Sequence, residues 1–538
     1  MPRCWCAAMA TVVVATPVWL GRAASGQEAA PDLIVVNANV YTGQRPRAQA
    51  LAMRGARIAA VGDDAELLRL RGPGTRVIDA LGRLVIPGIN DAHAHWGVDK
   101  AGTTLALESM EPGWEDVLQA LAVAKGRAPA GSWIFGSIGG RVLDDPRATR
   151  SALDTAAPDH PVRLGAWTGH GGLLNSAAMR ALGLPSDPPD AADGRVGRDE
   201  RGRFNGWLFE YPDWRARNGI GGEPRQAAIQ GLQAWAKRAA QFGITSLQVM
   251  PDLPADQFAT LLRDAGVRLR VRIIAFPRSR DEPPRAVVAT DRVRLSGIKW
   301  ILDGTPVERG AALRAPYRDR PASRGFLDFP ESFVGEALRA AAARSEQSLF
   351  HCAGDRCADV VLGAMEAEPA VDWPARRVRI EHGDGVIGDL IPRAARLGVI
   401  VVQNPSHLSL GELARARFGP GHAYQPLRSL LKAGIHVALG SDGPMNPYLN
   451  IQLAAAHPAR PEEALTLPEA LDAYTTGAAF AEHAEAEKGT LAPGQLADLA
   501  ILSQDIFAVP AERLAATRSV LTLVGGEVVF EAAPPEPR

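Results

Sequence analysis

The chain has 538 residues, of which 46% are hydrophobic and 22% charged, and its formal net charge is −1. This length exceeds that of an ordinary single domain, and the apolar content is ample for a large core. The balanced charge argues against a polybasic surface for nucleic acid or for an anionic membrane.

Residues 1–30 have the layout of a secretory signal peptide. Arg3 precedes an apolar run from Cys4 to Leu20, and small residues follow it. This order predicts export to the periplasm or beyond, with cleavage between Ala23 and Ala30. An uncleaved anchor is the alternative, but the run is short for a span and contains a proline. No later stretch is long and apolar enough, so we expect no stable membrane span after cleavage.

Two cysteines remain in the predicted mature chain. Cys352 and Cys357 are five residues apart and straddle a predicted strand end and helix start. We expect this geometry to disfavour a disulfide, so both are predicted to be buried thiols.

Both ends of the chain have short alternating strands separated by turns. Residues 31–83 predict the first part of a small β-sandwich, with strands at Leu33–Asn37, Ala38–Thr42, Ala50–Arg54, Arg57–Val61 and Arg76–Asp79. Residues 486–532 return to the same pattern and are predicted to complete the sandwich, with strands at Val520–Val524 and Glu527–Phe530.

Residues 84–485 alternate strands with helices, which predicts a parallel sheet with crossover helices. Counting Leu84–Asn90 as the first strand gives eight strand–helix units and an α/β fold of the TIM-barrel type. A doubly wound open sheet would show the same alternation. Residues 97–222 are rich in Gly, Pro and Asp and predict a large insertion after strand 1, with a helix at Glu115–Lys125. A capping box at Thr466–Glu469 predicts a helix that runs to about Glu482.

Metal-binding side chains cluster at the predicted strand ends. His93 and His95 are two residues apart, so in an extended chain both imidazoles point to one side, as in half of a zinc site. Alone, this pair would also fit two surface histidines near a turn. Functional residues of TIM barrels lie at the C-terminal strand ends. Those positions hold Asp91, His93, His95, Lys299, Asp303, His351, Glu381, His382, Ser441 and Asp442.

The motifs at these positions resemble those of the amidohydrolase superfamily from Leu33 to about Phe530. They are Val-Ile-Pro-Gly-Ile-Asn-Asp-Ala-His-Ala-His, Ile-Lys-Trp-Ile-Leu-Asp-Gly, Phe-His-Cys-Ala-Gly-Asp, Arg-Ile-Glu-His and Ala-Leu-Gly-Ser-Asp. Thr168-Gly-His-Gly-Gly-Leu-Leu-Asn-Ser176, inside the insertion, is similar to the branch of the N-substituted formamide deformylases.

The resemblance implies a site for one or two divalent ions, with zinc as the default. His93, His95 and Asp442 would hold one ion, and His351 and His382 the other. Lys299 would bridge them, which requires an N-carboxylated or deprotonated lysine because a free ammonium cannot bind a cation. Asp303 and Glu381 would support the ligands through hydrogen bonds.

Two residues have implied catalytic roles. Asp442 would accept a proton from the metal-activated water and deliver it to the departing nitrogen. His170 would donate a hydrogen bond to the substrate carbonyl oxygen; a histidine that only orders its own loop is the alternative.

We therefore expect a metal-dependent hydrolase of a non-peptide carbon–nitrogen bond in an amide, formamide, urea or carbamate. Its substrate would be a small molecule, with nucleic acid excluded and a homodimer left open. An ester or lactone hydrolase, a non-catalytic metal-binding or ligand-binding barrel, and an isomerase or lyase using the same metals are the alternatives.

Overall fold

The structure is a computed structural model that describes residues 29–43, 47–280, 282, 289–419 and 423–533. Residues 1–28 of the predicted signal peptide lie outside the described residues.

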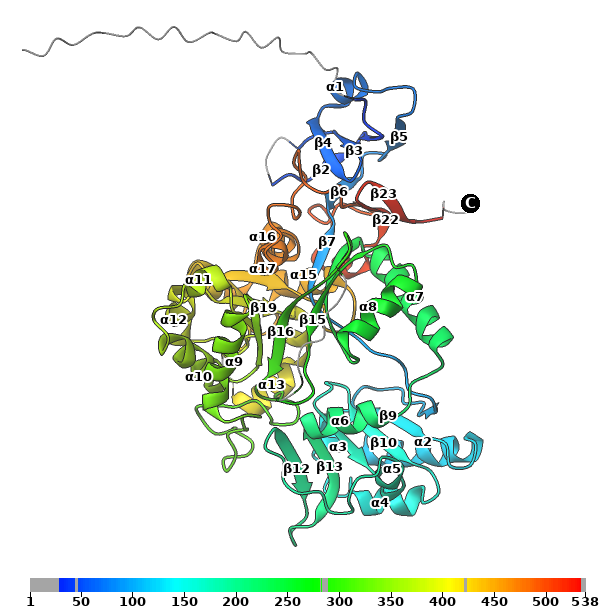
Figure 1. Ribbon diagram of the computed structural model, residues 1–538, viewed down its shortest axis with the longest axis vertical. Helices are drawn as coiled ribbons and strands as arrows, with labels where there is room; N and C mark the ends of the chain where they lie inside the picture. The colour runs from blue at the N-terminus through cyan, green and yellow to red at the C-terminus, as the bar shows by residue number, and fades with distance from the viewer. Residues whose placement is uncertain (1–28, 44–46, 281, 283–288, 420–422, 534–538) are drawn as a thin grey trace, which may run out of the picture.

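The centre of the molecule is a nearly closed barrel of eight parallel strands (Figure 1). Its ends meet where the backbone N–H of Asp442, just after β20, donates to the carbonyl oxygen of His93 on β7 at 2.9 Å. The predicted barrel is therefore confirmed over the open sheet. In order around the sheet its strands are β7 (Ile89–Trp96), β14 (Ile244–Pro251), β15 (Arg270–Ala275), β16 (Val293–Ile301), β17 (Ser348–Cys352), β18 (Arg379–His382), β19 (Ile400–Gln403) and β20 (His436–Leu439).

The predicted first barrel strand, Leu84–Asn90, is wrong in its bounds. Residues Leu84–Pro87 form β6 of a separate sheet, and the barrel strand β7 begins at Ile89. Gly88 separates the two strands. A Cβ at this position would collide with the side chain of Thr245, so the close approach of the backbone to Thr245 requires glycine. The two histidines thus lie within β7 rather than beyond its end.

Helices connect the strands on the outside of the barrel. They include α7 (Arg225–Gln241), α8 (Ala255–Asp264), α9 (Glu331–Ala343), α10 (Asp355–Glu366), α12 (Leu390–Arg396) and α14 (Leu427–Lys432).

The predicted capping box is confirmed by reciprocal bonds between Thr466 and Glu469. The helix that it starts is divided at Thr475 into α16 (Leu467–Tyr474) and α17 (Thr476–Ala481), contrary to the single predicted helix. Thr475 adopts φ −120° and ψ −86°, outside the helical region.

Between β7 and α7 the chain forms a six-stranded sheet in the order β12-β13-β11-β10-β9-β8. Its buried side chains form two clusters of their own, and it lies at one end of the long axis (Figure 1). The sheet is richer in structure than predicted. Its elements are β8 (Thr103–Thr104), α2 (Trp114–Arg127), β9 (Ile134–Ile138), α3 (Gly140–Leu143), α4 (Arg150–Ala156), β10 (Val162–Ala166), β11 (Gly171–Leu174), α5 (Ser176–Ala181), β12 (Gly194–Arg198), β13 (Phe204–Glu210) and α6 (Tyr211–Gly219).

At the opposite end of the long axis, two small sheets share one apolar cluster that includes Leu51, Met53, Val85 and Leu499 (Figure 1). One has the order β4-β3-β1-β5, and the other, β2-β6-β21-β22-β23, joins strands from both chain ends. Their strands are β1 (Leu33–Val36), β2 (Asn39–Val40), β3 (Ala50–Arg54), β4 (Arg57–Gly62), β5 (Arg76–Asp79), β21 (Leu499–Leu502), β22 (Ser519–Val524) and β23 (Glu527–Glu531).

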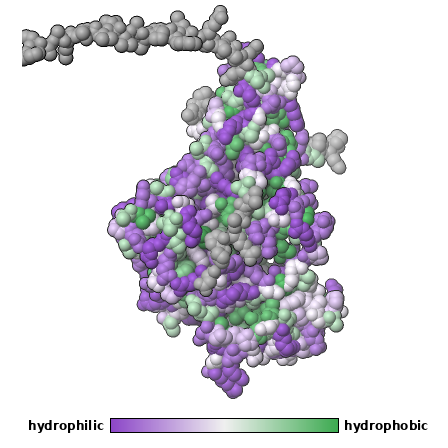
Figure 2. Space-filling model, viewed as in Figure 1, coloured by the Kyte–Doolittle hydropathy of each residue, from purple (hydrophilic) through white to green (hydrophobic). Residues whose placement is uncertain are grey.

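Hydrophilic residues dominate the face shown in Figure 2, and its hydrophobic residues gather mainly over the six-stranded sheet. None of the helices in the described part of the chain has the length and apolar character to cross a bilayer.

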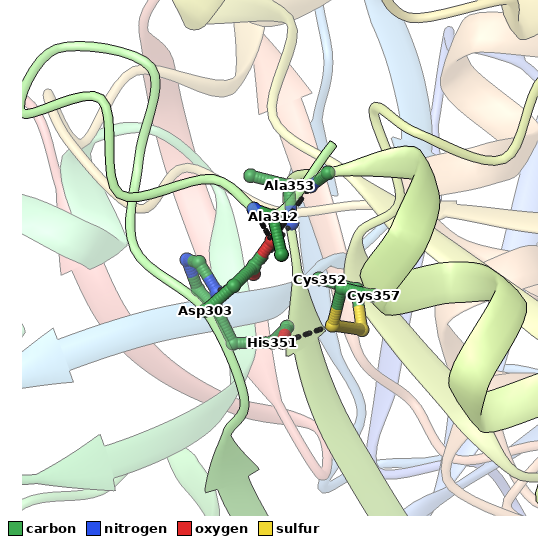
Figure 3. The surroundings of a disulfide bond; sticks show 7 residues. Asp303, Ala312, His351, Cys352, Ala353 and Cys357 are labelled. Atoms are coloured by element: carbon green, nitrogen blue, oxygen red, sulfur yellow. Dashed lines mark hydrogen bonds and ion pairs between the residues drawn. A yellow bond between two sulfur atoms is a disulfide. The ribbon is translucent and has the colours of Figure 1, made fainter. Parts of the chain in front are cut away.

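The prediction of two free thiols is wrong, because Cys352 and Cys357 form a disulfide (Figure 3). Cys352 ends β17 and Cys357 lies in the first turn of α10. The helix begins at Asp355, which brings the two Cα atoms to 5.5 Å, within the usual range for a disulfide. The bond ties the end of β17, next to His351, to the helix that follows.

Candidate active site

The candidate ligands converge at the C-terminal end of the barrel. His93 and His95 come from β7, Lys299 from β16, and His351 and His382 from β17 and β18. Asp442 lies three residues after the end of β20. His382 and Asp442 adopt positive φ angles of 65° and 53°, a strained conformation that is concentrated at functional sites.

Three of the imidazoles are held by their Nδ1 atoms. His93 Nδ1 lies 2.6 Å from Glu381, His95 Nδ1 lies 3.0 Å from the carbonyl oxygen of Met250, and His351 Nδ1 lies 3.2 Å from Asp303. The sequence predicted supporting contacts for Asp303 and Glu381, and the structure shows both. Orientation through Nδ1 leaves each Nε2 available to a metal ion. Among the described residues, Nδ1 of buried His382 has no hydrogen-bond partner.

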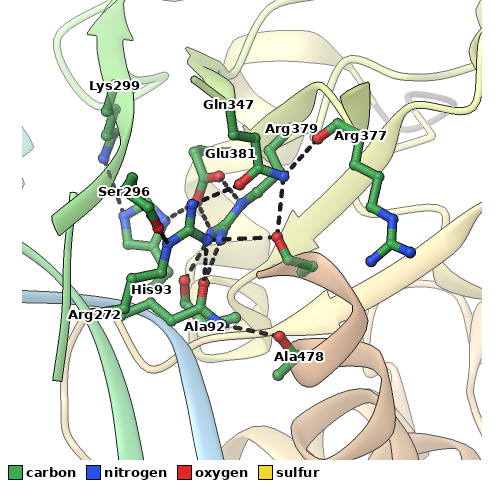
Figure 4. Close-up of polar contacts among 12 residues, drawn as sticks. Ala92, His93, Arg272, Ser296, Lys299, Gln347, Arg377, Arg379, Glu381 and Ala478 are labelled. Atoms are coloured by element: carbon green, nitrogen blue, oxygen red, sulfur yellow. Dashed lines mark hydrogen bonds and ion pairs between the residues drawn. The ribbon is translucent and has the colours of Figure 1, made fainter. Parts of the chain in front are cut away.

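Glu381 is itself held by a guanidinium inside the barrel (Figure 4). Arg379 donates to its two oxygens at 2.7 and 3.1 Å, and all of these side chains are fully buried. Burial would raise the pKa of Glu381, but Arg379 and the hydrogen bond to His93 hold it far below its ordinary value. The ionised carboxylate therefore accepts N–H from Nδ1 of His93, and the lone pair of that ring is on Nε2.

One compact group of possible metal ligands is His93, His382 and Asp442, whose ligand atoms all lie within 4.8 Å of one another. His95 Nε2 lies 3.6 Å from Oδ1 of Asp442, and Lys299 Nζ lies 3.2 Å from His93 Nε2. The structure thus brings His382 to the group that the sequence assigned to the first ion. His351 packs against the ring of His382 with a centroid distance of 4.5 Å.

The electrostatics of the site suit a cation. Burial lowers the pKa of His95 to about 3 and that of His382 well below 6.5. Both imidazoles are therefore neutral and can offer a nitrogen lone pair to a metal ion. Burial would raise the pKa of Asp442, but the contact with His407 and the neighbouring imidazoles hold it well below 3.8. A set of neutral imidazoles around an ionised carboxylate is the donor set that zinc prefers. The residues present therefore fit a divalent metal ion.

A cavity of about 420 Å³ opens onto this group. Its polar lining includes His170, His351, His382, His407 and Asp442. The remaining wall is largely apolar and includes Met110, Trp167, Val307, Leu410, Leu413 and Tyr424.

His170 reaches this cavity from the six-stranded sheet, immediately before β11. Its ring packs on His351 with a centroid distance of 4.7 Å, and its Nδ1 lies 2.8 Å from Oε2 of Glu210. Burial lowers the pKa of His170 to about 4, so the ring is neutral near pH 7.

The comparisons with known proteins agree with this geometry. Residues 76–530 match the model of the Amidohydrolase family. The chain is similar to the N-substituted formamide deformylase of Arthrobacter pascens, with 27% identity over 93% of this chain and 98% of that protein. It is also 26% identical to the putative amidohydrolase YtcJ of Bacillus subtilis, over 85% of this chain and 91% of that protein. A solved structure of an uncharacterised metal-dependent hydrolase from Pyrococcus furiosus has a TM-score of 0.66 at 23% identity, covering 88% of this chain and 99% of that one.

The chain belongs to the amidohydrolase family. It is an enzyme with a metal-dependent hydrolase fold that acts on carbon–nitrogen bonds other than peptide bonds, and its substrate is a small molecule.

Three residues at this amidohydrolase site gave little or no signal in the sequence. Glu210 and Asp384 are buried acids next to site histidines, and isolated acids of this kind follow no spacing rule. His407 lies just after β19, in the segment Pro405–Leu410, and its Nε2 lies 3.4 Å from Oδ2 of Asp442. Searching the sequence at the C-terminal ends of predicted barrel strands finds only residues that follow those strands. It does not find site residues that long loops or the insertion supply.

Proposed function

We propose that this amidohydrolase cleaves a neutral N-substituted amide of the formamide, urea or carbamate kind, with one or two divalent ions held by His93, His95, Lys299, His351, His382 and Asp442. The observation that carries the proposal is the convergence of neutral imidazoles and an ionised carboxylate beside one cavity.

Zinc is the default ion for these nitrogen and oxygen ligands. When bound, a divalent ion would supply a water molecule that is a nucleophile at neutral pH and would polarise the scissile carbonyl. The protein's part is to hold the ligands in place, through the Nδ1 contacts of His93, His95 and His351.

We propose that Lys299 enters this site as an N-carboxylated side chain. It is fully buried next to His93, and burial lowers the pKa of its ammonium to about 8. A useful fraction is then the free amine, which can add to CO2 with loss of one proton to give a carbamate. The carbamate would present two oxygens in place of a cation, which suits a bridging position between two ions.

Asp442 would carry the proton. Its Oδ1 faces His93 and His95 at 3.8 and 3.6 Å, whereas its Oδ2 faces His407 at 3.4 Å. One oxygen therefore lies on the metal side and the other towards the cavity that receives the substrate. This placement supports uptake of a proton from the attacking water and its delivery to the departing nitrogen, a step that an ester does not need.

His170 would donate a hydrogen bond to the carbonyl oxygen as negative charge develops there. Its place beside His351 in the cavity lining supports this role.

The cavity wall supports a substrate with an uncharged, apolar substituent. Among the described residues that line it, none is a lysine or arginine, and the acids are Asp384 and Asp442. A substrate carboxylate would find no lysine or arginine in this wall, whereas an alkyl or aryl group would pack against Leu410, Leu413 and Val307.

The proposal is tested by measuring amine release from formamides of apolar amines, with the matching acetamides, ureas and a phenyl ester of similar size. We expect the highest kcat/KM for an uncharged carbon–nitrogen substrate, loss of turnover after chelation, and recovery with zinc and bicarbonate. Hydrolysis of the ester alone, or turnover that survives complete removal of metal, would contradict the proposal.

We also propose that the enzyme is exported to the periplasm or secreted. The disulfide between Cys352 and Cys357 supports an oxidising compartment. Fractionation of the producing cell tests this, because recovery of the full-length chain in the cytoplasm alone would contradict export.

A further inference from the structure

Glu210 is a buried acid in an unusual backbone conformation. It ends β13, precedes α6 and has no exposed surface. Its φ of 60° lies in the region that favours glycine, and its side chain makes no capping bond to α6. A non-glycine residue in this conformation is strained and persists where the surrounding structure holds it in place.

The side chain of Glu210 makes one polar contact that the structure shows. Its Oε2 lies 2.8 Å from Nδ1 of His170, and its Oε1 has no hydrogen-bond partner among the described residues. Gly304 lies against Oε1, and a Cβ at that position would come within 2.5 Å of it. Oε1 is therefore buried, and no donor among the described residues reaches it.

The ionisable side chains around Glu210 are mostly acids. The groups that act on it most strongly are Glu308, Asp303 and Asp213, together with Arg195, and it acts in turn on Asp328. Arg195 lies over the rings of Phe209 and Phe326 at 4.3 and 5.1 Å, and Asp213 is already paired with Arg163. Burial and the acidic neighbours raise the pKa of Glu210 well above 4.5.

We propose that Glu210 is a neutral carboxylic acid whose O–H donates to Nδ1 of His170, so that His170 carries its proton on Nε2. This inference rests on the proposed function, in which His170 is the donor to the substrate carbonyl. Glu210 is thus a positioning residue that sets the tautomer of a catalytic one.

An ionised Glu210 would prevent His170 from donating a hydrogen bond to the substrate carbonyl oxygen. A carboxylate at Glu210 would accept N–H from Nδ1, and the lone pair of a neutral His170 would then be on Nε2. That nitrogen is the ring atom left to face the cavity, so it would repel the developing negative charge on the carbonyl oxygen. A carboxylate would also leave Oε1 charged, buried and without a donor.

The direct test is the protonation of the two ring nitrogens, read by two- and three-bond ¹H–¹⁵N correlations in protein labelled with ¹⁵N-histidine. The zinc-reconstituted full chain is used, and the signals of His170 are assigned from their loss in His170→Asn. We expect Nε2 protonated and Nδ1 unprotonated from pH 5.5 to 8. A ring protonated on Nδ1, or on both nitrogens, would overturn the proposal. The spectrum does not depend on turnover, so this outcome is independent of whether the substrate class is right.

Two variants separate positioning from a structural role. Glu210→Gln keeps the shape and a neutral donor, so it should retain the Nε2 tautomer and a kcat within about threefold of wild type. Glu210→Leu removes the donor and should give mixed tautomers, with kcat lower by at least about tenfold and little change in KM. A large loss of kcat in Glu210→Gln would instead indicate a required negative charge and would overturn the proposal.

Asp328→Asn is the matched control. Asp328 is a buried acid of the same group with both oxygens unpartnered among the described residues, and it has no contact with His170. This variant should leave the tautomer of His170 and kcat unchanged. A change in the tautomer here would mean that any loss of a buried acid disturbs the ring, and would contradict the specific role of Glu210.

Discussion

At the scale of single residues, the site depends on how each side chain is oriented by its neighbours. Asp442 is fixed on two sides, because its Oδ1 faces the imidazoles of β7 and its Oδ2 faces His407. Asp442 is proposed both to accept a proton and to bind the metal ion. Its substitution should therefore affect turnover and metal content, which can be measured separately.

The first prediction concerns Asp442→Asn. The amide cannot take up the proton, so kcat should fall by about 10²- to 10⁴-fold, while the fold is retained. Steady-state kinetics with the best substrate of the panel measures this, and metal content is determined in parallel. Turnover close to that of wild type would refute the acid–base role.

The second prediction concerns Glu381→Gln. The variant removes the charge that orients His93 and leaves the buried guanidinium of Arg379 without its carboxylate. We expect the apparent affinity for zinc to fall by about 10- to 100-fold. Competition with a chromophoric chelator measures this loss.

Glu366→Gln is the control for this change, because Glu366 also pairs with arginines but lies at the surface on α10. Its zinc affinity should equal that of wild type. Equal affinities in all three proteins would contradict the orienting role of Glu381.

At the scale of elements, one buried glutamate joins segments at the N-terminal side of the barrel. Glu482, just after α17, accepts from Asn90 of β7, from Arg294 of β16 and from Lys488, each at 2.7 Å. Burial would raise its pKa, but Lys488 and the two nearest arginines lower it to about 2. Glu482 therefore stabilises the fold fully above its ordinary pKa of 4.5, and this contribution is lost as the pH falls towards 2.

The third prediction is that Glu482→Gln lowers the free energy of unfolding at pH 7 by about 3 kcal/mol, because it leaves the nearly buried ammonium of Lys488 without its carboxylate, while the exposed guanidinium of Arg294 is solvated. The difference from wild type should shrink between pH 4.5 and 2. Urea unfolding at a fixed metal concentration tests this. Glu485→Gln, which breaks a partly exposed pair with Arg377, should cost at most about 1 kcal/mol. A difference that stays constant down to pH 2 would contradict the assignment to ionised Glu482.

At the scale of the whole molecule, periodic patterns were readable from the sequence and long-range contacts were not. The strand–helix rhythm located the barrel and the residues at its strand ends, and the resemblance to a known family selected six of them as ligands that the structure brings together. The boundary at Gly88 was missed because the apolar run from Leu84 continues past it, and only the collision with Thr245 shows why the chain changes sheets there. The disulfide was missed because it depends on where α10 begins.

Contacts within the insertion were also not predictable from the sequence. Its sheet brings His170 and Glu210 together from positions 40 residues apart in the chain. His170 was found because its glycine-flanked motif resembles a known branch. Glu210 is one of 60 acidic residues, and nothing in its local sequence marks it as the partner.

The central claim is that the imidazoles and Asp442 at the barrel end hold catalytic metal. The most direct test is the metal content per chain, by elemental analysis of the full-length protein purified without chelator, beside the double variant His93→Ala/Asp442→Asn. We expect at least one divalent ion per wild-type chain, close to two if Lys299 is carboxylated, and a loss of metal in the variant. A wild-type chain that holds no ion after reconstitution with zinc or manganese and bicarbonate, or a variant that keeps the full wild-type content, would contradict the claim.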